Sequence, residues 1–147
     1  TRHDTIHLTL AFLGNGLSTE QFPALIHLAK GIRAPSFELD IDRVGFWSHN
    51  QLLWAGCSSF PPGFFLFADQ LRAALYAAGY LPDREMERFA PHITLIRRIS
   101  KGVLPPPLET IDRIAWYCSG FELISSRVPN AVSSYLTLSD FSLASVA

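Results

Sequence analysis

The sequence predicts an α+β fold with two similar lobes, each built from an antiparallel sheet and flanking helices, around a central cleft. The first reason is the order of the segments. It runs strand, helix, hairpin, helix, strand and further strands, with short turns between several neighbouring strands. The second reason is a repeated motif: HLTL at residues 7–10 recurs as HITL at residues 92–95, 92 − 7 = 85 residues later. Two copies of one motif, each in strand-like surroundings, suggest two similar lobes.

The first strand and the first helix are expected near the N-terminus. Residues 6–14 (IHLTLAFLG) are rich in branched and aromatic side chains and are followed by turn-forming residues, which is typical of a strand. Ser18 and Gln21 then form a capping-box pattern, and apolar residues at helical spacing continue to about Arg33. Pro23 is compatible with this helix because it lies near the first turn.

A hairpin and a second helix are expected next. Residues 37–46 and 51–57 have the pattern of two strands, joined by a polar turn at residues 48–50. The Pro-Pro-Gly sequence at residues 61–63 then opens a helix with an apolar face, for which Gly79 is the natural stop.

The C-terminal half predicts strands. Residues 91–99 (PHITLIRRI) form one, and three consecutive prolines at residues 105–107 interrupt the chain after it. Residues 114–126 and 134–143 are expected to form two more strands.

The composition indicates a single domain spanning residues 1–147, since 48% of the residues are hydrophobic and 17% are charged. A net charge of −1 argues against a protein that binds long duplex nucleic acid, because such binding needs many contacts between basic residues and phosphates. It allows a substrate with one or two phosphates. Without a membrane-length apolar run or a secretory signal pattern, we expect a cytoplasmic protein with no membrane association. Cys57 and Cys118 lie in apolar stretches, where buried free thiols are expected.

The repeated motif carries the candidate chemistry. Side chains alternate along a strand, so His7 and Thr9 should share one face, and His92 and Thr94 should share one face of theirs. If the two lobes face each other, each lobe presents one imidazole and one hydroxyl to the cleft. A lone strand histidine is more often structural than catalytic, and it is the duplication that favours function.

Displacement at phosphorus suits this set of groups. One group must take a proton from the entering oxygen and another must give one to the leaving oxygen, and histidine can do either near neutral pH. Thr9 and Thr94 can donate hydrogen bonds to the phosphate oxygens. No cluster of well-spaced metal ligands accompanies the motifs, so we expect no metal and no other cofactor. The sequence also lacks a GxxxxGK[ST] loop that would hold ATP for a ligase.

The two motif segments, IHLTLAFLG and APHITLIRR, resemble the signature strands of the 2H phosphoesterase superfamily. The resemblance is to its LigT-like branch of bacterial RNA 2',3'-cyclic phosphodiesterases, also called 2'-5' RNA ligases. It extends over essentially the whole chain and includes the VGFW and LLWAG segments of the hairpin. It implies two lobes around a pseudo-twofold axis, with the motifs facing across a cleft. Family members usually begin with a strand and a helix before the first motif, and we expect this chain to lack them.

The same resemblance implies a set of site residues. His7 and His92 are the expected catalytic residues, and Thr9 and Thr94 are the expected substrate-binding residues. Arg97 matches an arginine that the family carries shortly after the second histidine. Alternation alone would place Arg97 on the opposite face from His92, so an inward orientation requires a strand end, a bulge or the long reach of its side chain.

The expected function is hydrolysis of an RNA 2',3'-cyclic phosphate end to a 2'-phosphate by two-histidine acid-base catalysis. Three alternatives remain open: 2'-5' RNA ligation by the reverse chemistry, hydrolysis of a small cyclic nucleotide, and a non-catalytic RNA- or nucleotide-binding module. The expected partner is therefore such an RNA end or a small cyclic nucleotide, and the protein is expected to be a monomer. Phe46 and Trp47 could stack on a nucleobase, although packing in or beside the core is the simpler interpretation.

Overall fold

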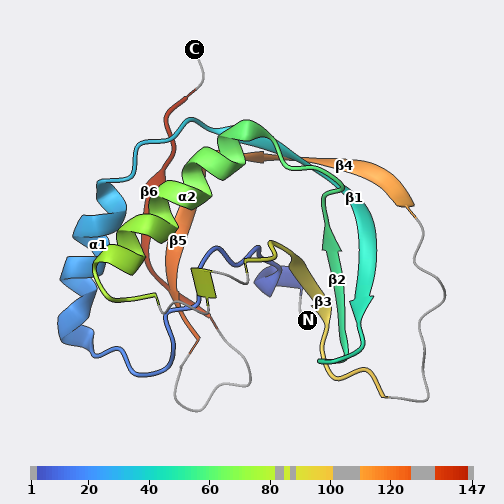
Figure 1. Ribbon diagram of the computed structural model, residues 1–147, viewed down its shortest axis with the longest axis horizontal. Coiled ribbons are helices and arrows are strands. Elements are labelled where there is room, and N and C mark those ends of the chain that lie inside the picture. Colours follow the sequence, from blue (N-terminus) through green and yellow to red (C-terminus); the bar gives the residue numbers. More distant parts are fainter. Residues whose placement is uncertain (1–2, 82–84, 87–88, 101–109, 127–134, 146–147) are drawn as a thin grey trace. The chain divides into compact units, whose positions relative to one another are not determined.

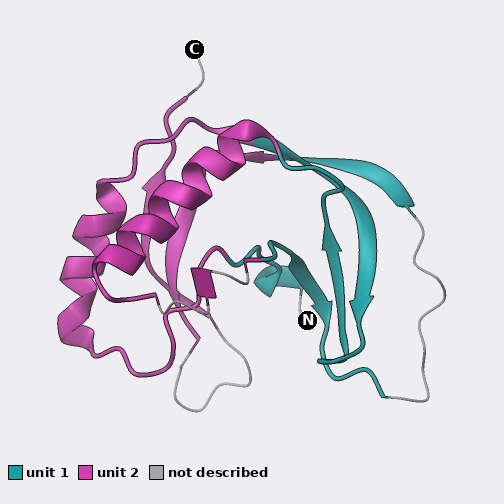
Figure 2. Ribbon diagram, in the orientation of Figure 1, with its two compact units in different colours: residues 1–9, 38–60, 90–116 teal, residues 10–37, 61–89, 117–147 magenta. Residues whose placement is uncertain are grey.

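The computed structural model describes residues 3–81, 85–86, 89–100, 110–126 and 135–145. The chain divides into two compact units, each assembled from three stretches of sequence (Figure 2). Unit 1 comprises residues 1–9, 38–60 and 90–116, and unit 2 comprises residues 10–37, 61–89 and 117–147. The antiparallel strand pairs and two α-helices confirm the predicted α+β class.

Unit 1 is built around a four-stranded sheet with the strand order β3-β2-β1-β4 (Figure 1). The strands are β1 (Phe37–Trp47), β2 (Leu52–Gly56), β3 (Ile93–Ile96) and β4 (Thr110–Cys118). β1 and β2 form the predicted antiparallel hairpin, and β2 pairs antiparallel with β3. The hairpin therefore lies between the second motif and β4 in the sheet.

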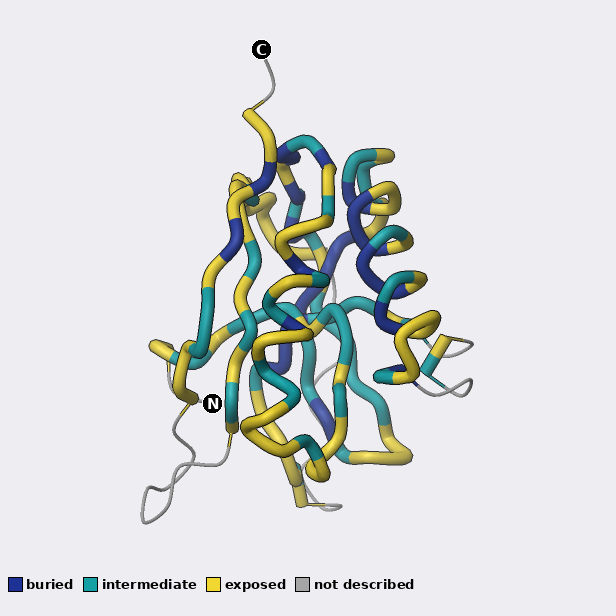
Figure 3. The backbone as a smooth tube through the Cα atoms, turned by 90° about the vertical axis from the view of Figure 1, so that its left-hand side faces the viewer, coloured by how far each residue is buried: buried dark blue, intermediate teal, exposed yellow. Residues whose placement is uncertain are grey.

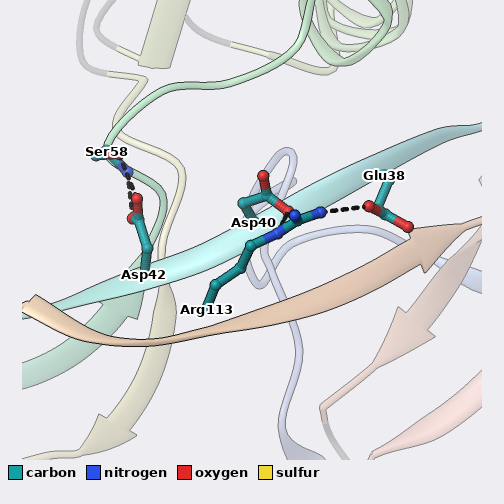
Figure 4. A network of polar contacts seen from close by, with 5 residues as sticks. All are labelled: Glu38, Asp40, Asp42, Ser58 and Arg113. Atoms are coloured by element: carbon teal, nitrogen blue, oxygen red, sulfur yellow. Dashed lines mark hydrogen bonds and ion pairs between the residues drawn. The ribbon is translucent and has the colours of Figure 1, made fainter.

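Ionic contacts connect the two strands at one side of this sheet (Figure 4). Arg113 on β4 donates to Asp40 Oδ1 at 2.5 Å and to Glu38 Oε1 at 2.7 Å, both on β1. Asp42, further along β1, accepts hydrogen bonds from the backbone and hydroxyl of Ser58, and these hydrogen bonds lower the pKa of its carboxyl group. These groups are exposed, so solvent screens the ion pairs of Arg113 and they add little to stability.

Unit 2 packs two helices with a two-stranded antiparallel sheet. Its elements are the 3-10 helix η2 (Thr19–Gln21), α1 (Phe22–Lys30), α2 (Pro62–Ala77), β5 (Gly120–Ser125) and β6 (Leu136–Ser142). The ring of Phe67 on α2 lies 4.9 Å from that of Phe121 on β5, which lies 5.0 Å from that of Phe141 on β6. The predicted capping box of Ser18 and Gln21 is present.

Both helices have a buried side and an exposed side (Figure 3). One of the buried residues of α2 is an arginine. Arg72 is 4% exposed, and its guanidinium donates to the carbonyl oxygens of Leu10, at 2.7 Å, and of Glu85. It also lies over the Phe89 ring, 4.1 Å from the centroid. Burial lowers the pKa of Arg72. This side chain thus binds the backbone at the last residue of the first motif and at a residue shortly before the second.

One predicted strand is in fact two. The stretch at residues 114–126 is interrupted at Ser119, so that β4 joins the sheet of β1 while β5 pairs with β6. The Ser119 carbonyl accepts a hydrogen bond from the Leu143 amide at 2.8 Å. A Cβ at Gly120 would lie 2.6 Å from the Phe141 carbonyl oxygen, so this close approach of β5 and β6 requires glycine.

The structure of residues 6–14 also differs from the predicted strand. These residues contribute a single bridge, from Leu8 to Ile93, and no continuous strand. Their apolar pattern is that of a strand, but a ladder needs a partner along its length, and β3 is only 4 residues long. β3 is itself shorter than the predicted strand at residues 91–99, because Arg98 adopts a left-handed conformation with a φ of 58°.

Neither cysteine forms a disulfide; Cys57 is buried, as predicted, whereas Cys118 is only partly buried. Burial raises the pKa of the Cys118 thiol to about 11, so this group is protonated at neutral pH. In the part of the chain that the structure describes, no helix has the length and apolar character needed to cross a membrane. The three prolines at residues 105–107 lie outside the described residues.

Candidate active site

The two motif segments meet at the edge of the unit 1 sheet. Leu8 forms an antiparallel bridge with Ile93, the first residue of β3. Both residues of this bridge belong to unit 1, and the boundary between the two units falls within the first motif, between Thr9 and Leu10. The bridge adds the first motif to the free edge of the strand that carries the second.

The register of this bridge gathers the polar side chains of both motifs. Opposite residues of an antiparallel pair point to the same face, and their neighbours point to the other. With Leu8 opposite Ile93, His7 comes next to Thr94, and Thr9 comes next to His92. Both histidines and both threonines of the motifs therefore lie on one face, at the spacing of cross-strand neighbours.

The two imidazoles are held in the same way. His7 Nδ1 lies 2.8 Å from the Thr5 carbonyl oxygen, and His92 Nδ1 lies 2.7 Å from the Ala90 carbonyl oxygen. A carbonyl oxygen can only accept a hydrogen bond, so in both rings Nδ1 carries the hydrogen. The other nitrogen, Nε2, is then the atom that can take up a proton in the neutral ring and release one in the charged ring.

The burial of the motif side chains is graded. Thr94 is 8% exposed, the two histidines are half-buried, and Thr9 is exposed. Ile93, on the opposite face, is 6% exposed and belongs to the core. Both imidazoles are thus anchored in the protein and still reach its surface, as proton transfer to a bound substrate requires.

Trp54 on β2 lies on the same face as the motif side chains. It is paired with Thr94 on one side and with Gly45 of β1 on the other. A Cβ at Gly45 would lie 2.1 Å from the indole ring, and one at Gly56 would lie 3.3 Å from it. The two glycines leave room for the indole to lie flat against the sheet.

We therefore expect Gly45→Ala to lower the free energy of unfolding by about 1–3 kcal/mol, the usual cost of overpacking, because Trp54 must leave its position. Chemical denaturation would measure this loss. Gly16→Ala is the matched control, since a Cβ there meets nothing within 4 Å and its φ is not in the positive range. Equal stability of the two variants would contradict the packing of Trp54 against Gly45.

Trp47, at the end of β1, is in ring contact with the second histidine. Its ring centroid lies 4.6 Å from that of His92, with the planes at 71°, and 5.4 Å from that of Trp54. The sequence pointed to Trp47 only as a possible base-stacking or packing residue. Its contact with His92 depends on the pairing of three strands and has no local signal in the sequence.

A bulge between β2 and β3 changes the alternation of side chains before Arg97. Trp54 is paired with Thr94, whereas the preceding residue, Leu53, is paired with Ile96, so β3 contains one extra residue. This shifts the alternation by one position and puts Ile96 on the face opposite to Thr94. Continued alternation from Ile96 would bring Arg97 to the face of Thr94, before the left-handed residue Arg98 turns the chain. Its side chain is exposed.

Among the described residues, no group of three or more histidine, cysteine, aspartate or glutamate side chains is arranged to hold a metal ion. The arrangement at the edge of β3 consists of two imidazoles, two hydroxyls and, beyond the bulge, an arginine. Such a set can bind a phosphate and exchange protons with it.

The chain is similar to known phosphoesterases. A sequence model of the LigT-like phosphoesterases matches residues 1–54, which include the first motif. The RNA 2',3'-cyclic phosphodiesterase of Escherichia coli (strain K12) is 41% identical over 105 residues, covering 71% of this chain and 58% of the relative's length. The enzyme of that name from Thermus thermophilus is 30% identical over 147 residues, covering 94% of this chain and 72% of the relative's length.

Solved structures agree in fold. The crystal structure of E. coli LigT complexed with 3'-AMP matches with a TM-score of 0.82 at 34% identity, covering 95% of this chain and 78% of that chain. TT0787 of Thermus thermophilus matches with a TM-score of 0.74 at 26% identity, covering 93% of this chain and 77% of that chain.

Proposed function

Because this chain belongs to the family of LigT-like phosphoesterases, we propose that it hydrolyses RNA 2',3'-cyclic phosphate ends to 2'-phosphates. His7 and His92 are the proposed catalytic residues. Thr9, Thr94 and Arg97 are the proposed ligands of the phosphate. The curated relatives are named for a cyclic phosphodiesterase activity on RNA, which supports this choice of substrate.

The observation that carries the proposal is the antiparallel register of Leu8 with Ile93. It makes neighbours of two H-x-T motifs that are 85 residues apart in sequence (92 − 7 = 85). Nδ1 of both histidines lies within hydrogen-bond distance of a backbone carbonyl oxygen, so Nε2 is the proposed proton-transfer atom of each ring. A binding module would need no such pair of equivalent proton-transfer atoms.

The proposed reaction is a displacement at phosphorus. His92 acts as the base, and its neutral Nε2 takes a proton from water as the water oxygen attacks the phosphorus atom. The bond from phosphorus to the ribose 3'-oxygen breaks, and Nε2–H of His7 gives its proton to that oxygen. The products are a 2'-phosphomonoester and a 3'-hydroxyl group, and the two histidines exchange their protonation states.

The hydroxyls and the arginine stabilise the negative charge on the phosphate. Thr9 and Thr94 donate to the non-bridging oxygens, where negative charge is concentrated during the displacement. Arg97 can add a charge-assisted hydrogen bond, and the bulge in β3 supports its orientation toward the same face. The strain of a five-membered cyclic phosphodiester makes a metal electrophile unnecessary for its opening.

We expect turnover to be unaffected by chelation of divalent metals. The measurement is incubation with EDTA and an RNA that carries a 2',3'-cyclic phosphate end, followed by mapping of the terminal phosphate. A 2'-phosphate is the expected product. Loss of turnover that one specific metal restores would contradict the metal-independent reaction.

The same assay separates the alternatives. Addition of an RNA with a 5'-hydroxyl end tests for the reverse reaction, which would yield a 2'-5' linkage. A small substrate such as ADP-ribose 1'',2''-cyclic phosphate tests for a preference for nucleotides. Binding of the cyclic end without any turnover would indicate a non-catalytic module.

The proposed enzyme is a cytoplasmic monomer with one domain over residues 1–147. The proposed site residues all come from unit 1 of a single chain, which supports a monomer. Each unit is assembled from three separated stretches of sequence, which supports cooperative folding of the whole chain. Light scattering during size-exclusion chromatography tests the monomer, and coincident unfolding transitions by different probes test the single domain.

A further inference from the structure

We propose that Trp47 is a positioning residue for His92, whose indole ring holds the imidazole in the orientation in which Nε2 reaches the phosphate. This inference rests on the proposed function, in which His92 transfers a proton. Trp47 and His92 both belong to unit 1, and they come from the two ends of its three-strand segment β1, β2 and β3.

The contact between the two rings is close and specific in geometry. Their centroids are 4.6 Å apart and their planes are inclined at 71°, so the edge of one ring meets the face of the other. Aromatic pairs favour this arrangement because the positive ring edge meets the negative ring face. The indole therefore favours one plane for the imidazole over the others.

This contact complements the hydrogen bond at the other side of the imidazole. His92 Nδ1 is tied to the Ala90 carbonyl oxygen at 2.7 Å. A single hydrogen bond still leaves the imidazole some freedom to rotate about its Cβ–Cγ bond. A ring packed against the imidazole removes that freedom. Together, the carbonyl and the indole fix both the tautomer and the direction of Nε2.

Trp47 also packs against two further aromatic rings. Its ring lies 5.4 Å from that of Trp54, which lies flat in the space that Gly45 leaves on β1. The His49 ring lies 6.2 Å from the Trp47 ring, with the planes at 31°. The indole thus already packs against the rings of His92, Trp54 and His49, which favours a positioning role over stacking on a nucleobase of the substrate.

The test compares Trp47→Leu, which fills space without a ring, with Trp47→Phe, which keeps an aromatic face. Trp116→Leu is the matched control, because Trp116 lies on β4, separated from β3 by two strands. For Trp47→Leu we expect kcat to fall about 10- to 100-fold, the usual effect of a small misplacement of a reacting group, with KM nearly unchanged. Trp47→Phe should recover most of this loss, and Trp116→Leu should keep wild-type kcat.

A second measurement does not depend on activity. NMR of the histidine rings in the free protein should show His92 with Nδ1–H in the wild type and in Trp47→Phe, and a mixture of tautomers in Trp47→Leu. A rise in KM with unchanged kcat would overturn the inference in favour of base stacking. Equal losses in Trp47→Leu and Trp116→Leu would overturn it in favour of a general effect on folding.

The two proposals fail in different ways. Absence of turnover by the wild-type protein on any cyclic phosphate would refute the proposed function. The NMR comparison would still decide whether Trp47 holds His92, since it needs no substrate. An unchanged Nδ1–H signal of His92 in folded Trp47→Leu would overturn the positioning role.

Discussion

Alanine at either motif histidine is expected to lower kcat/KM on a 2',3'-cyclic phosphate end by at least about 100-fold. This figure is the lower limit usually found for one proton transfer, which typically contributes about 10²- to 10⁴-fold. Both losses should be large because each histidine acts on a different oxygen, and neither can replace the other. Initial rates at several substrate concentrations measure the effect.

His27→Ala is the matched control for these variants, because His27 is an exposed residue on α1 in unit 2. It should keep the activity of the wild type. A loss below tenfold at His7 or His92 would show that the residue does not transfer a proton in the rate-limiting step. Equal losses in all three variants would point to a general effect of the substitutions on the fold.

The motif threonines are expected to matter less than the histidines. Thr9→Ala and Thr94→Ala each remove a hydrogen-bond donor to the phosphate and leave both imidazoles in place. Thr94 is buried and Thr9 is exposed, so Thr94→Ala should also cost more stability. Thermal unfolding together with kcat separates the two effects.

Local patterns predicted much of the fold and the composition of the candidate site. The capping box at Ser18, the hairpin of β1 and β2, and the helix beginning at Pro62 all depend on residues close together in sequence. The repeated H-x-T motif identified the candidate catalytic pair in the same way, because its signal is the spacing of side chains within one strand.

The differences arise where distant segments determine the structure. No local pattern shows that residues 6–14 find only one bridge to β3, or that the stretch at residues 114–126 divides between two sheets. The bulge beside Trp54 depends on the pairing of β2 with β3, and alternation within one strand cannot reveal it.

Close packing explains two further features that the sequence did not reveal. Gly45 is needed because the indole of Trp54 lies over it, and the buried Arg72 is needed because it binds the carbonyls of Leu10 and Glu85. In the sequence, Gly45 resembles any glycine in a strand, and Arg72 resembles any arginine in a helix. Their roles depend on the tertiary contact, which is specified by residues elsewhere in the chain.

The assignment of acid and base to the two histidines leads to the second large effect. His7→Ala should lose at least about 100-fold on a cyclic phosphate, because its 3'-oxygen leaving group needs a proton. On a nitrophenyl phosphodiester of a nucleoside, whose leaving group departs without protonation, the same variant should recover most of this loss. His92→Ala should remain impaired on both substrates, because activation of water is still required.

The measurement is the ratio of variant to wild-type kcat/KM on each of the two substrates, which cancels differences in their intrinsic reactivity.

The pH dependence gives an independent check. With one histidine neutral and the other protonated at the start, the wild-type profile on the cyclic substrate should be bell-shaped. His7→Ala should lose the alkaline limb, since that limb reports loss of the acid's proton, and His92→Ala should lose the acidic limb. If His92→Ala recovered on the nitrophenyl substrate and lost the alkaline limb, while His7→Ala did neither, the two roles would be reversed. If neither variant recovered, both imidazoles would mainly bind the phosphate.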